Sequence, residues 1–370
     1  MTAGRHPTRG INRMWQVAGA ILVAVAGIGR EPGIGPLPLQ RLIPPPAGNY
    51  YLGVFPGSRN GMGGDITPED VKTYEHAVGK SLTWVYFWNN WYDNPHFPHH
   101  AASWIRANGS VPYIRMMLLS RPTIPRPDPV YSLQHIIEGK FDPLLRNWMR
   151  EARRFGSPVI AEYGVEVNGW WFPWNGLYNK EGGTYADSVA RFREAYRRII
   201  RISREEGAFN VRWVFHVDPW DEPVEDWNKF ENYYPGDEWI DWVGASVYGR
   251  QLPSDPEAIS FRYQMDWVYR RMERLTSKPF IVCEFGTIAD PHQATWTKAA
   301  LADLVVGRWP RVIGFSWWNT IFKNDPATGR LSDMRVQDSA ELPAIFREYV
   351  GRNNAVISAP ISRVVTPNAR

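Results

Sequence analysis

The stretch Pro158–Trp174 reads PVIAEYGVEVNGWWFPW, an apolar run that leads into a turn and then four aromatic residues. The run Val159–Val165, followed by an Asn-Gly pair, is typical of a buried strand that ends in a loop. Side chains alternate between strand faces, so Glu162 and Glu166 share one face. A strand-terminal glutamate beside flat rings suits a sugar-cleaving site, because pyranoses present CH-rich faces to indoles and burial raises the pKa of a carboxylic acid. A surface acid beside core tryptophans would fit this segment equally well.

A second glutamate favours the sugar-cleaving site over the surface acid. The segment Lys278–Thr287 reads KPFIVCEFGT, in which a buried strand over Phe280–Cys283 leads to Glu284 and then to a glycine turn. Two strand-terminal glutamates, each followed by a glycine turn, indicate the paired-carboxylate chemistry of glycoside hydrolysis.

Composition limits the possible folds and partners. The chain has 370 residues, 44% of them hydrophobic, which suffices for one large α/β barrel or two ordinary domains. Its 19 tryptophans and 17 tyrosines exceed the needs of a core and are common in carbohydrate-binding clefts. The formal net charge is +4, and Arg5, Arg9 and Arg13 carry three of these charges, so no nucleic-acid partner is indicated.

The N-terminal part is expected to direct export. Residues 1–30 combine basic residues with the apolar run Val17–Ala26, which ends in an A-x-A pattern and is short for a membrane span. We expect a signal peptide and a secreted or periplasmic protein, or retention of this segment as an N-terminal membrane anchor. Residues 31–49 are proline-rich and are predicted to form an extended linker. Cys283 is the only cysteine, so the fold must rest on its core.

The remaining chain alternates strand-like and helical runs, which predicts a single (β/α)₈ barrel over residues 50–350. Catalytic groups of such barrels lie at the C-terminal ends of strands, where Glu166 follows the fourth predicted strand and Glu284 ends the seventh. Residues 351–370 are expected to be a disordered tail or to lie over the barrel bottom. The predicted strands are 51–55, 82–87, 112–117, 159–163, 211–217, 240–246, 280–283 and 312–317. The predicted helices are 68–79, 99–108, 142–155, 184–206, 227–233, 256–276, 293–307 and 340–350.

Four motifs in this order resemble glycoside hydrolase family 26, the β-mannanase-like family of clan A. They are EVNGWWFPW (Glu166–Trp174), YYPGDEWIDWVGASVY (Tyr233–Tyr248), KPFIVCEFG (Lys278–Gly286) and IGFSWWN (Ile313–Asn319). The resemblance implies a retaining enzyme in which Glu284 is the nucleophile and Glu166 the acid/base, with carboxyl groups about 5 Å apart. It also implies that the Tyr248 hydroxyl bonds the nucleophile.

The sequence departs from the family at two positions. Family members usually carry histidine immediately before the acid/base and arginine four residues before it, where this chain has Val165 and Glu162. An unpaired carboxylate inside the barrel would be strongly unfavourable, so we predict that Glu162 pairs with Arg115 at the end of the third strand. These changes put mannan specificity in doubt more than the chemistry.

The predicted function is a retaining endo-glycanase that acts on a β-linked polysaccharide, with no metal or cofactor. A catalytically silent glycan-binding barrel and a transglycosylase using the same residues are the alternatives. Sugar contacts are expected from the aromatic run after Glu166 and from the ends of other strands. The candidates are Trp171, Trp174, Arg115, either Trp88 or Trp91, and either His216 or Trp220. The family resemblance also implies that Trp317 or Trp318, at the end of the eighth strand, forms the floor of the subsite where the bond breaks.

Overall fold

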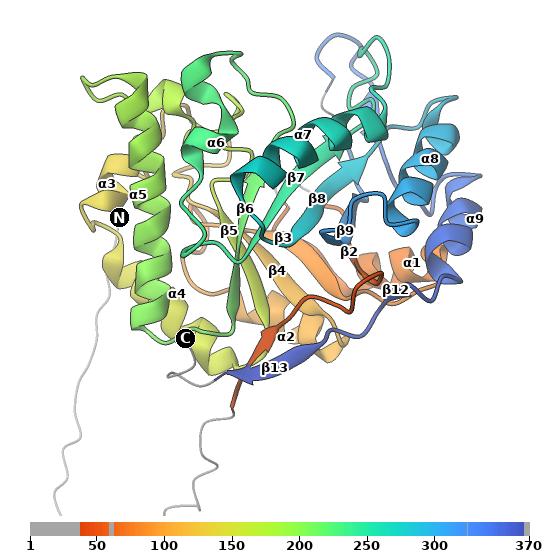
Figure 1. The fold of residues 1–370 in the computed structure, drawn as a ribbon, viewed down its shortest axis with the longest axis horizontal. Helices are drawn as coiled ribbons and strands as arrows, with labels where there is room; N and C mark the ends of the chain where they lie inside the picture. Colours follow the sequence, from red (N-terminus) through yellow and green to blue (C-terminus); the bar gives the residue numbers. More distant parts are fainter. Residues whose placement is uncertain (1–37, 59–62, 324, 366–370) are drawn as a thin grey trace, which may run out of the picture. The chain divides into compact units, whose positions relative to one another are not determined.

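The computed structural model describes residues 38–58, 63–323 and 325–365, and within them a closed barrel of eight parallel strands confirms the predicted fold (Figure 1). The barrel closes because β2 pairs with both β3 and β9. Residues 1–30, the predicted targeting segment, lie outside the described residues. The barrel strands are β2 (Tyr50–Phe55), β3 (Trp84–Asn90), β4 (Val111–Met117), β5 (Val159–Tyr163), β6 (Val211–Val217), β7 (Trp242–Tyr248), β8 (Phe280–Gly286) and β9 (Val312–Trp318).

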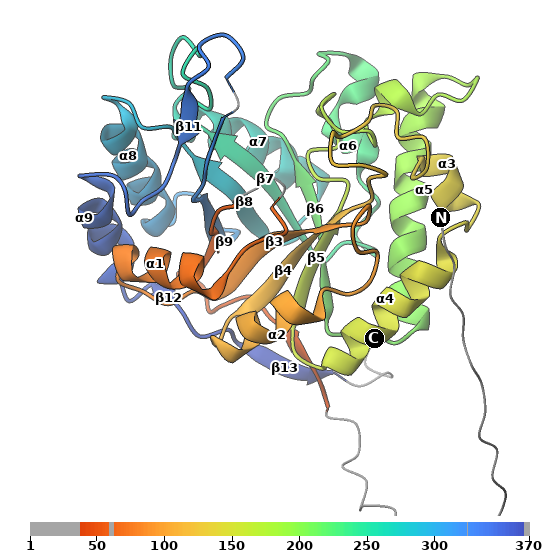
Figure 2. The same ribbon diagram turned by 180° about the vertical axis from the view of Figure 1, so that it is seen from behind.

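Helices surround the barrel on its outside (Figures 1 and 2). Among the described residues, no helix is both long enough and apolar enough to cross a membrane. The helices are α1 (Pro68–Val78), α2 (His99–Ala107), α3 (Leu133–Ile137), α4 (Asp142–Phe155), α5 (Tyr185–Glu205), α6 (Phe230–Tyr233), α7 (Phe261–Leu275), α8 (Gln293–Val305) and α9 (Leu342–Phe346).

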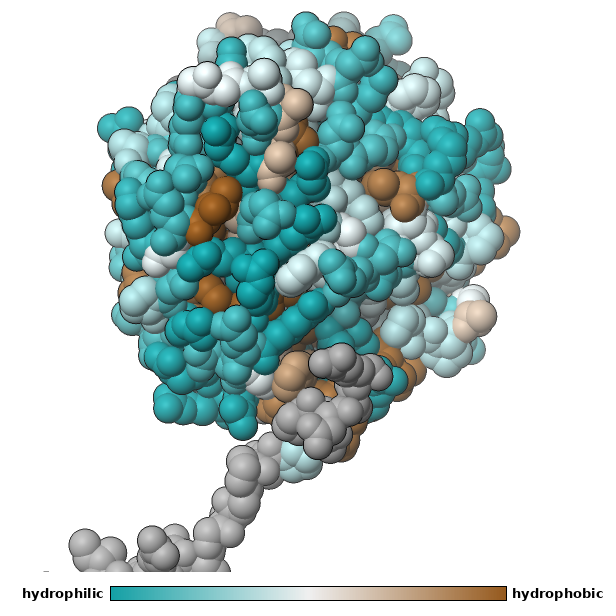
Figure 3. Space-filling view, turned by 60° about the vertical axis from the view of Figure 1, so that its left-hand side comes forward, coloured by the Kyte–Doolittle hydropathy of each residue, from teal (hydrophilic) through white to brown (hydrophobic). Residues whose placement is uncertain are grey.

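Helix α5 shows how local sequence sets these elements. It begins after Thr184, whose hydroxyl accepts from the backbone of Asp187 while the Asp187 carboxylate accepts from the backbone of Thr184. Its apolar side chains, Phe192 and Ile199 among them, face the barrel and are buried. The surface on this side of the molecule is largely hydrophilic, with apolar residues in small separate patches (Figure 3).

The boundaries of β5, β6 and α4 agree with the sequence prediction, whereas the other predicted elements differ by one residue or more. Strand β8 continues to Gly286, so Glu284 lies inside the strand rather than just beyond it. Helix α7 begins at Phe261 instead of Pro256, because the Ser260 side chain caps its first turn.

Trp84 fills the lower part of the barrel interior. Its indole nitrogen donates to the Ser316 hydroxyl at 2.8 Å, across the barrel. A Cβ atom at Gly53 would lie 1.9 Å from this indole, and one at Gly314 would lie 2.3 Å from it. Glycine is therefore required at both positions, and the interior below the cleft is closed by one large ring.

The ends of the described chain meet at the bottom of the barrel. Strand β1 (Leu39–Leu42) pairs antiparallel with β13 (Ser362–Val365), and β12 (Val356–Ile357) adds to the lower end of β2 (Figure 2). The predicted linker over residues 31–49 thus needs correction, because its proline content does not prevent residues 39–42 from forming a strand. The predicted tail, over the part that the structure describes, lies across the barrel bottom.

Candidate active site

A cleft opens at the C-terminal ends of the barrel strands and has a volume of about 640 Å³. Glu166, in the turn after β5, and Glu284, on β8, both line it. Other residues that line the cleft are Trp88, Arg115, Trp171, Phe172, Asp218, Trp220, Glu222, Ser246, Tyr248, Gln264 and Trp318.

Glu166 is partly exposed and its backbone is in a rare conformation. Its φ is 48°, in the left-handed region that side chains other than glycine seldom adopt. Hydrogen bonds from the Glu166 amide to the His216 carbonyl (3.0 Å) and from the Gly169 amide to the Glu166 carbonyl (2.8 Å) hold this turn. The indole nitrogen of Trp171 donates to Glu166 Oε2 at 2.7 Å, so the carboxylate has a fixed direction.

A bulge in β8 directs Glu284 into the cleft. Val282 pairs with Ala245 of β7, but the next partner, Ser246, pairs with Glu284, so Cys283 is an extra residue. Strict alternation would place Cys283 and Glu284 on opposite faces. The bulge allows both to point inward, with Cys283 Sγ 3.5 Å from the Tyr113 hydroxyl.

Arg115 and Tyr248 are the two closest donors to the Glu284 carboxylate, and the Tyr86 hydroxyl lies farther away, 3.4 Å from Oε1. The residue is only 4% exposed. The Tyr248 hydroxyl donates to Oε2 at 2.6 Å, and the Arg115 guanidinium forms an ion pair with Oε1. Burial, reinforced by the charge of Glu166, raises the pKa of Tyr248 well above its usual value, so its hydroxyl keeps the proton that it donates. The surroundings of Glu284 therefore favour its ionised form.

The two glutamates meet across the cleft. A carboxylate oxygen of Glu166, a carboxylate oxygen of Glu284 and a ring nitrogen of His216 all lie within 4.8 Å of one another. Residues that are 118 positions apart in the sequence are thus close enough to act on the same glycosidic carbon.

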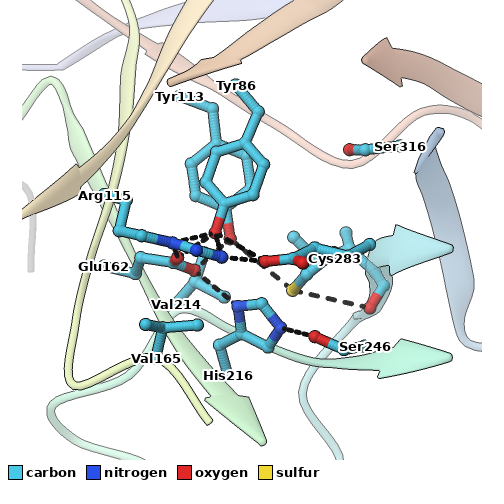
Figure 4. Close-up of polar contacts among 12 residues, drawn as sticks. Tyr86, Tyr113, Arg115, Glu162, Val165, Val214, His216, Ser246, Cys283 and Ser316 are labelled. Atoms are coloured by element: carbon cyan, nitrogen blue, oxygen red, sulfur yellow. Dashed lines mark hydrogen bonds and ion pairs between the residues drawn. The ribbon is translucent and has the colours of Figure 1, made fainter. Parts of the chain in front are cut away.

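A buried polar network lies beneath Glu284 and contains the predicted pair of Glu162 and Arg115 (Figure 4). Arg115 and Glu162 are register partners on β4 and β5, and Arg115 Nε donates to Glu162 Oε1 at 3.0 Å. Tyr86 accepts from Arg115 and donates to Glu162. The Tyr113 hydroxyl donates to Glu162 Oε2 at 2.6 Å, and His216 Nδ1 lies 3.0 Å from the same oxygen. Arg115 thereby connects Glu162 to Glu284.

This network sets the charge of its members. Burial alone would raise the pKa of Glu162, but His216, Arg115 and the Tyr113 hydroxyl outweigh it and lower that pKa to about 2. Burial and the Glu162 charge raise the pKa of the Cys283 thiol well above its usual value. Glu162 is consequently a carboxylate and Cys283 a neutral thiol at neutral pH.

Two groups of side chains in the described part of the chain are close enough to share a metal ion. They are Glu162, His216 and Cys283, and Glu166, His216 and Glu284. The oxygens of Glu162 already accept from four side chains, and the Arg115 cation lies against both Glu162 and Glu284. A second cation would meet repulsion there, so these donors suit carboxylate chemistry better than metal binding.

Most predicted sugar contacts line the cleft, and four do not. Trp88, Trp171, Trp220 and Trp318 face the cleft together with Arg115 and Tyr248. Of the two alternatives on β9, Trp318 points inward and Trp317 outward, because adjacent residues of a strand alternate. Trp317 is fully buried against Phe346 and donates to the Met334 carbonyl, so it has no access to a sugar.

Trp91, Trp174 and His216 also need correction. Trp91 is buried and packs edge-on against Tyr131, away from the cleft. Trp174 stacks on Phe172 and donates to the Val165 carbonyl. These contacts stabilise the loop after Glu166 and leave Trp174 no role as a sugar contact. His216 is 1% exposed and bridges Glu162 to the Ser246 hydroxyl, which leaves it a structural role below the cleft.

Sequence reasoning missed several site residues. The inward position of Tyr86 could have been predicted, because alternation along Trp84–Trp88 turns every second side chain toward the barrel interior. The same alternation places Tyr113 on the inward face with Arg115. Glu222, which lines the cleft, carries no local signal, because it lies in a loop. Asp218 lines the cleft, and burial together with the charge of Glu166 raises its pKa well above the usual value.

The closed barrel with paired strand-end glutamates defines a site of the glycoside hydrolase class. The sequence profile described as Glycosyl hydrolase family 26 matches residues 133–335, more than half of the chain. The chain therefore belongs to this family, as its motifs predicted.

Similar proteins agree with this assignment. Endoglucanase H of Acetivibrio thermocellus is 25% identical over 311 residues, which cover 83% of this chain and 31% of that protein. The β-1,3-xylanase TXYA of a Vibrio species is 31% identical over 120 residues, covering 32% of this chain and 23% of that protein. The chain thus spans a third or less of the length of these curated relatives. The mannanase man26 of Bacillus subtilis has the same fold, with a TM-score of 0.58 and 16% identity over 87% of this chain and 92% of its own.

Proposed function

We propose that this protein is a retaining, endo-acting glycoside hydrolase that cleaves a β-linked polysaccharide by double displacement. The observation that carries the proposal is the approach of the Glu166 and Glu284 carboxylates to within 4.8 Å at the mouth of the barrel. Retaining enzymes hold their carboxyl groups about 5–5.5 Å apart, whereas inverting enzymes need about 6.5 Å or more to admit a water molecule.

In the first step, Glu284 attacks the anomeric carbon while Glu166 donates its proton to the departing glycosidic oxygen. The carbon–oxygen bond breaks, and a covalent glycosyl–Glu284 ester forms. In the second step, Glu166 removes a proton from water, whose oxygen attacks the same carbon and releases Glu284. Arg115 and Tyr248 keep Glu284 ionised before attack and receive it again as a leaving group.

The substrate is a β-glycan of a kind to be determined. Proteins similar to this chain are named as an endoglucanase, a β-1,3-xylanase and mannanases, which act on three different sugars. Val165 and Glu162 alter the surroundings of Glu166, which argues against mannan as the only candidate. Export through residues 1–30, to a secreted or periplasmic location or to an N-terminal membrane anchor, would bring the enzyme to extracellular polysaccharide.

The test is a panel of β-1,4-mannan, glucomannan, β-1,3-xylan and carboxymethylcellulose, with chain length of products and anomeric configuration followed by NMR. We expect internal cleavage of at least one polysaccharide and initial release of the β-anomer. Initial release of the α-anomer would show inversion and contradict the double displacement. Binding without cleavage would identify a catalytically silent barrel, and products longer than the substrate would identify a transglycosylase.

A further inference from the structure

Helix α7 carries two exposed aromatic side chains next to the cleft. Tyr263 is 62% exposed and Trp267 is 48% exposed, and they lie one helical turn apart, on the same face of α7. Rings of this size usually bury most of their surface, so a contiguous exposed group of them marks a surface that binds something.

These rings continue the aromatic lining of the cleft. The ring centroid of Trp220, which lines the cleft, lies 6.0 Å from that of Tyr263 and 6.2 Å from that of Trp267. The angles between the ring planes are only 34° and 25°. Trp220, Tyr263 and Trp267 therefore form one group of neighbouring rings, the aromatic platform, which extends from the cleft onto α7.

The aromatic platform is held in place from below. The Trp220 amide donates to Asp218 Oδ1 at 2.8 Å, and the side chain of the buried Asn168 donates to the Trp220 carbonyl at 3.1 Å. The guanidinium of Arg271 lies 5.7 Å from the Trp267 ring and is itself paired with Asp221 at 2.8 Å. The rings are thus prearranged, which lowers the entropy cost of binding a ligand.

Intervening residues connect the aromatic platform to the surroundings of both catalytic glutamates. Gln264, between Tyr263 and Trp267 on α7, donates to the carbonyl of Tyr248, the residue that bonds Glu284. The segment that carries Trp220 is tied to the turn after Glu166 through Asn168. Glu166 protonates the departing oxygen in the proposed mechanism, and the tie between its turn and the Trp220 segment favours a position of the platform on the side of the departing sugar chain.

We propose that the aromatic platform binds sugar units of the departing portion of a β-linked polysaccharide, beyond the units held in the cleft. The inference rests on the proposed function and extends it to residues outside the cleft. Stacking on flat rings suits a pyranose chain, because the CH-rich sugar faces contact the rings while the hydroxyl groups stay in water. The Arg271 guanidinium, which lies over the Trp267 ring, is neutralised by Asp221 and Glu231.

The experiment compares a Tyr263→Ala/Trp267→Ala double variant with a Tyr263→Phe/Trp267→Phe variant that keeps both rings. Val306→Ala removes an exposed apolar side chain at the end of α8 and serves as the control for the loss of such a side chain on a different helix. Each is assayed on the polysaccharide that the wild type cleaves best and on an aryl β-disaccharide, whose departing group is too short to reach α7. We expect the alanine variant to lose about tenfold in kcat/KM on the polysaccharide and nothing on the aryl substrate. The phenylalanine and Val306→Ala variants should resemble the wild type on both.

Equal losses on both substrates would overturn the inference, because they would indicate a structural role for the rings. Unchanged activity of the alanine variant on both would also overturn it and leave α7 as a surface for a different class of partner. Affinity electrophoresis in the same polysaccharides, with Glu284→Gln added to each variant, tests binding separately from turnover. Retardation that depends on the two rings, together with a wild type that cleaves none of these polysaccharides, would uphold the platform and refute the proposed function.

Discussion

Glu284 and Glu166 face the same cleft, but Glu284 is buried in a strand and Glu166 is partly exposed in a turn. The Glu284 carboxylate forms an ion pair with Arg115 and accepts a hydrogen bond from Tyr248, whereas the Glu166 carboxylate accepts one side-chain hydrogen bond among the described residues, from Trp171. The proposed roles explain this difference. A nucleophile must stay ionised, which two permanent donors favour, while an acid/base must exchange its proton with substrate and water and so needs an open side.

The largest effect is expected at the buried glutamate. Replacement Glu284→Gln keeps the shape of the side chain but removes the attacking charge, so turnover of the polysaccharide should fall by about 10⁴-fold or more. The measurement is kcat beside a thermal unfolding curve. Residual activity above about 1% of the wild type would show that another group is the nucleophile.

Glu166→Ala should cost about 10²–10⁴-fold on the polysaccharide, because a sugar alkoxide departs poorly without a proton. The first step should be nearly unaffected on an aryl glycoside with an acidic phenol, which departs without help. Pre-steady-state release of the phenol measures that step. An equal loss of rate on both substrates would show that Glu166 is not the acid. The two glutamates would then not differ in the way proposed.

Glu162→Gln tests whether the network below supports Glu284. The change leaves the guanidinium of Arg115 less firmly placed against the nucleophile, and we expect kcat to fall about 10–100-fold with KM little changed. Loss of one member of a buried charge pair should also lower the free energy of unfolding by about 2–4 kcal/mol. Glu162→Asp, which keeps the charge, should recover part of kcat. A larger change in KM than in kcat would place the effect in substrate binding.

The low pKa of Glu162 has a consequence for stability in acid. Because the folded-state pKa is about 2 and the ordinary value is 4.5, ionised Glu162 stabilises the fold above about pH 4.5. This contribution, on the order of 3 kcal/mol, should be lost as the pH falls from 4.5 toward 2. Chemical unfolding at several pH values should show a steeper acid dependence in the wild type than in Glu162→Gln. If the free energy of unfolding changed with pH to the same extent in both proteins, the low pKa of Glu162 would be contradicted.

The smallest change in kcat is expected from a substitution next to the partly exposed glutamate, Glu166. Trp171→Phe keeps the ring but removes the hydrogen bond to Glu166, and we expect kcat to fall about 3–10-fold with unchanged thermal stability. Trp317→Phe is the matched control, since it alters a tryptophan that has no access to the cleft. A loss of kcat on Trp317→Phe as large as that on Trp171→Phe would remove the distinction between lining and core rings.

The barrel was predictable because its signals are local. Strands β5 and β6 are apolar runs bounded by turn residues, and α4 has both a strong apolar face and a proline in its first turn. The glutamates were predictable for the same reason, since each ends an apolar run. The pairing of Glu162 with Arg115 followed from the cost of a buried carboxylate together with the order of the strands.

Other features depend on contacts that no local pattern encodes. The bulge at Cys283 is set by pairing with β7, and it decides that Glu284 faces the cleft. The roles of Trp91, Trp174 and His216 depend on side chains from other elements that close around them. Strand β1 could not be predicted, because prolines surround it and its partner β13 lies more than 300 residues later.

The pairing of Leu39 with Val365 has a practical consequence. The polypeptide enters and leaves the barrel at a shared point on its underside, while the opening for polysaccharide faces the opposite way. A module, label or solid support joined at either position would hang from that underside. It would leave long polymers free to approach the catalytic mouth.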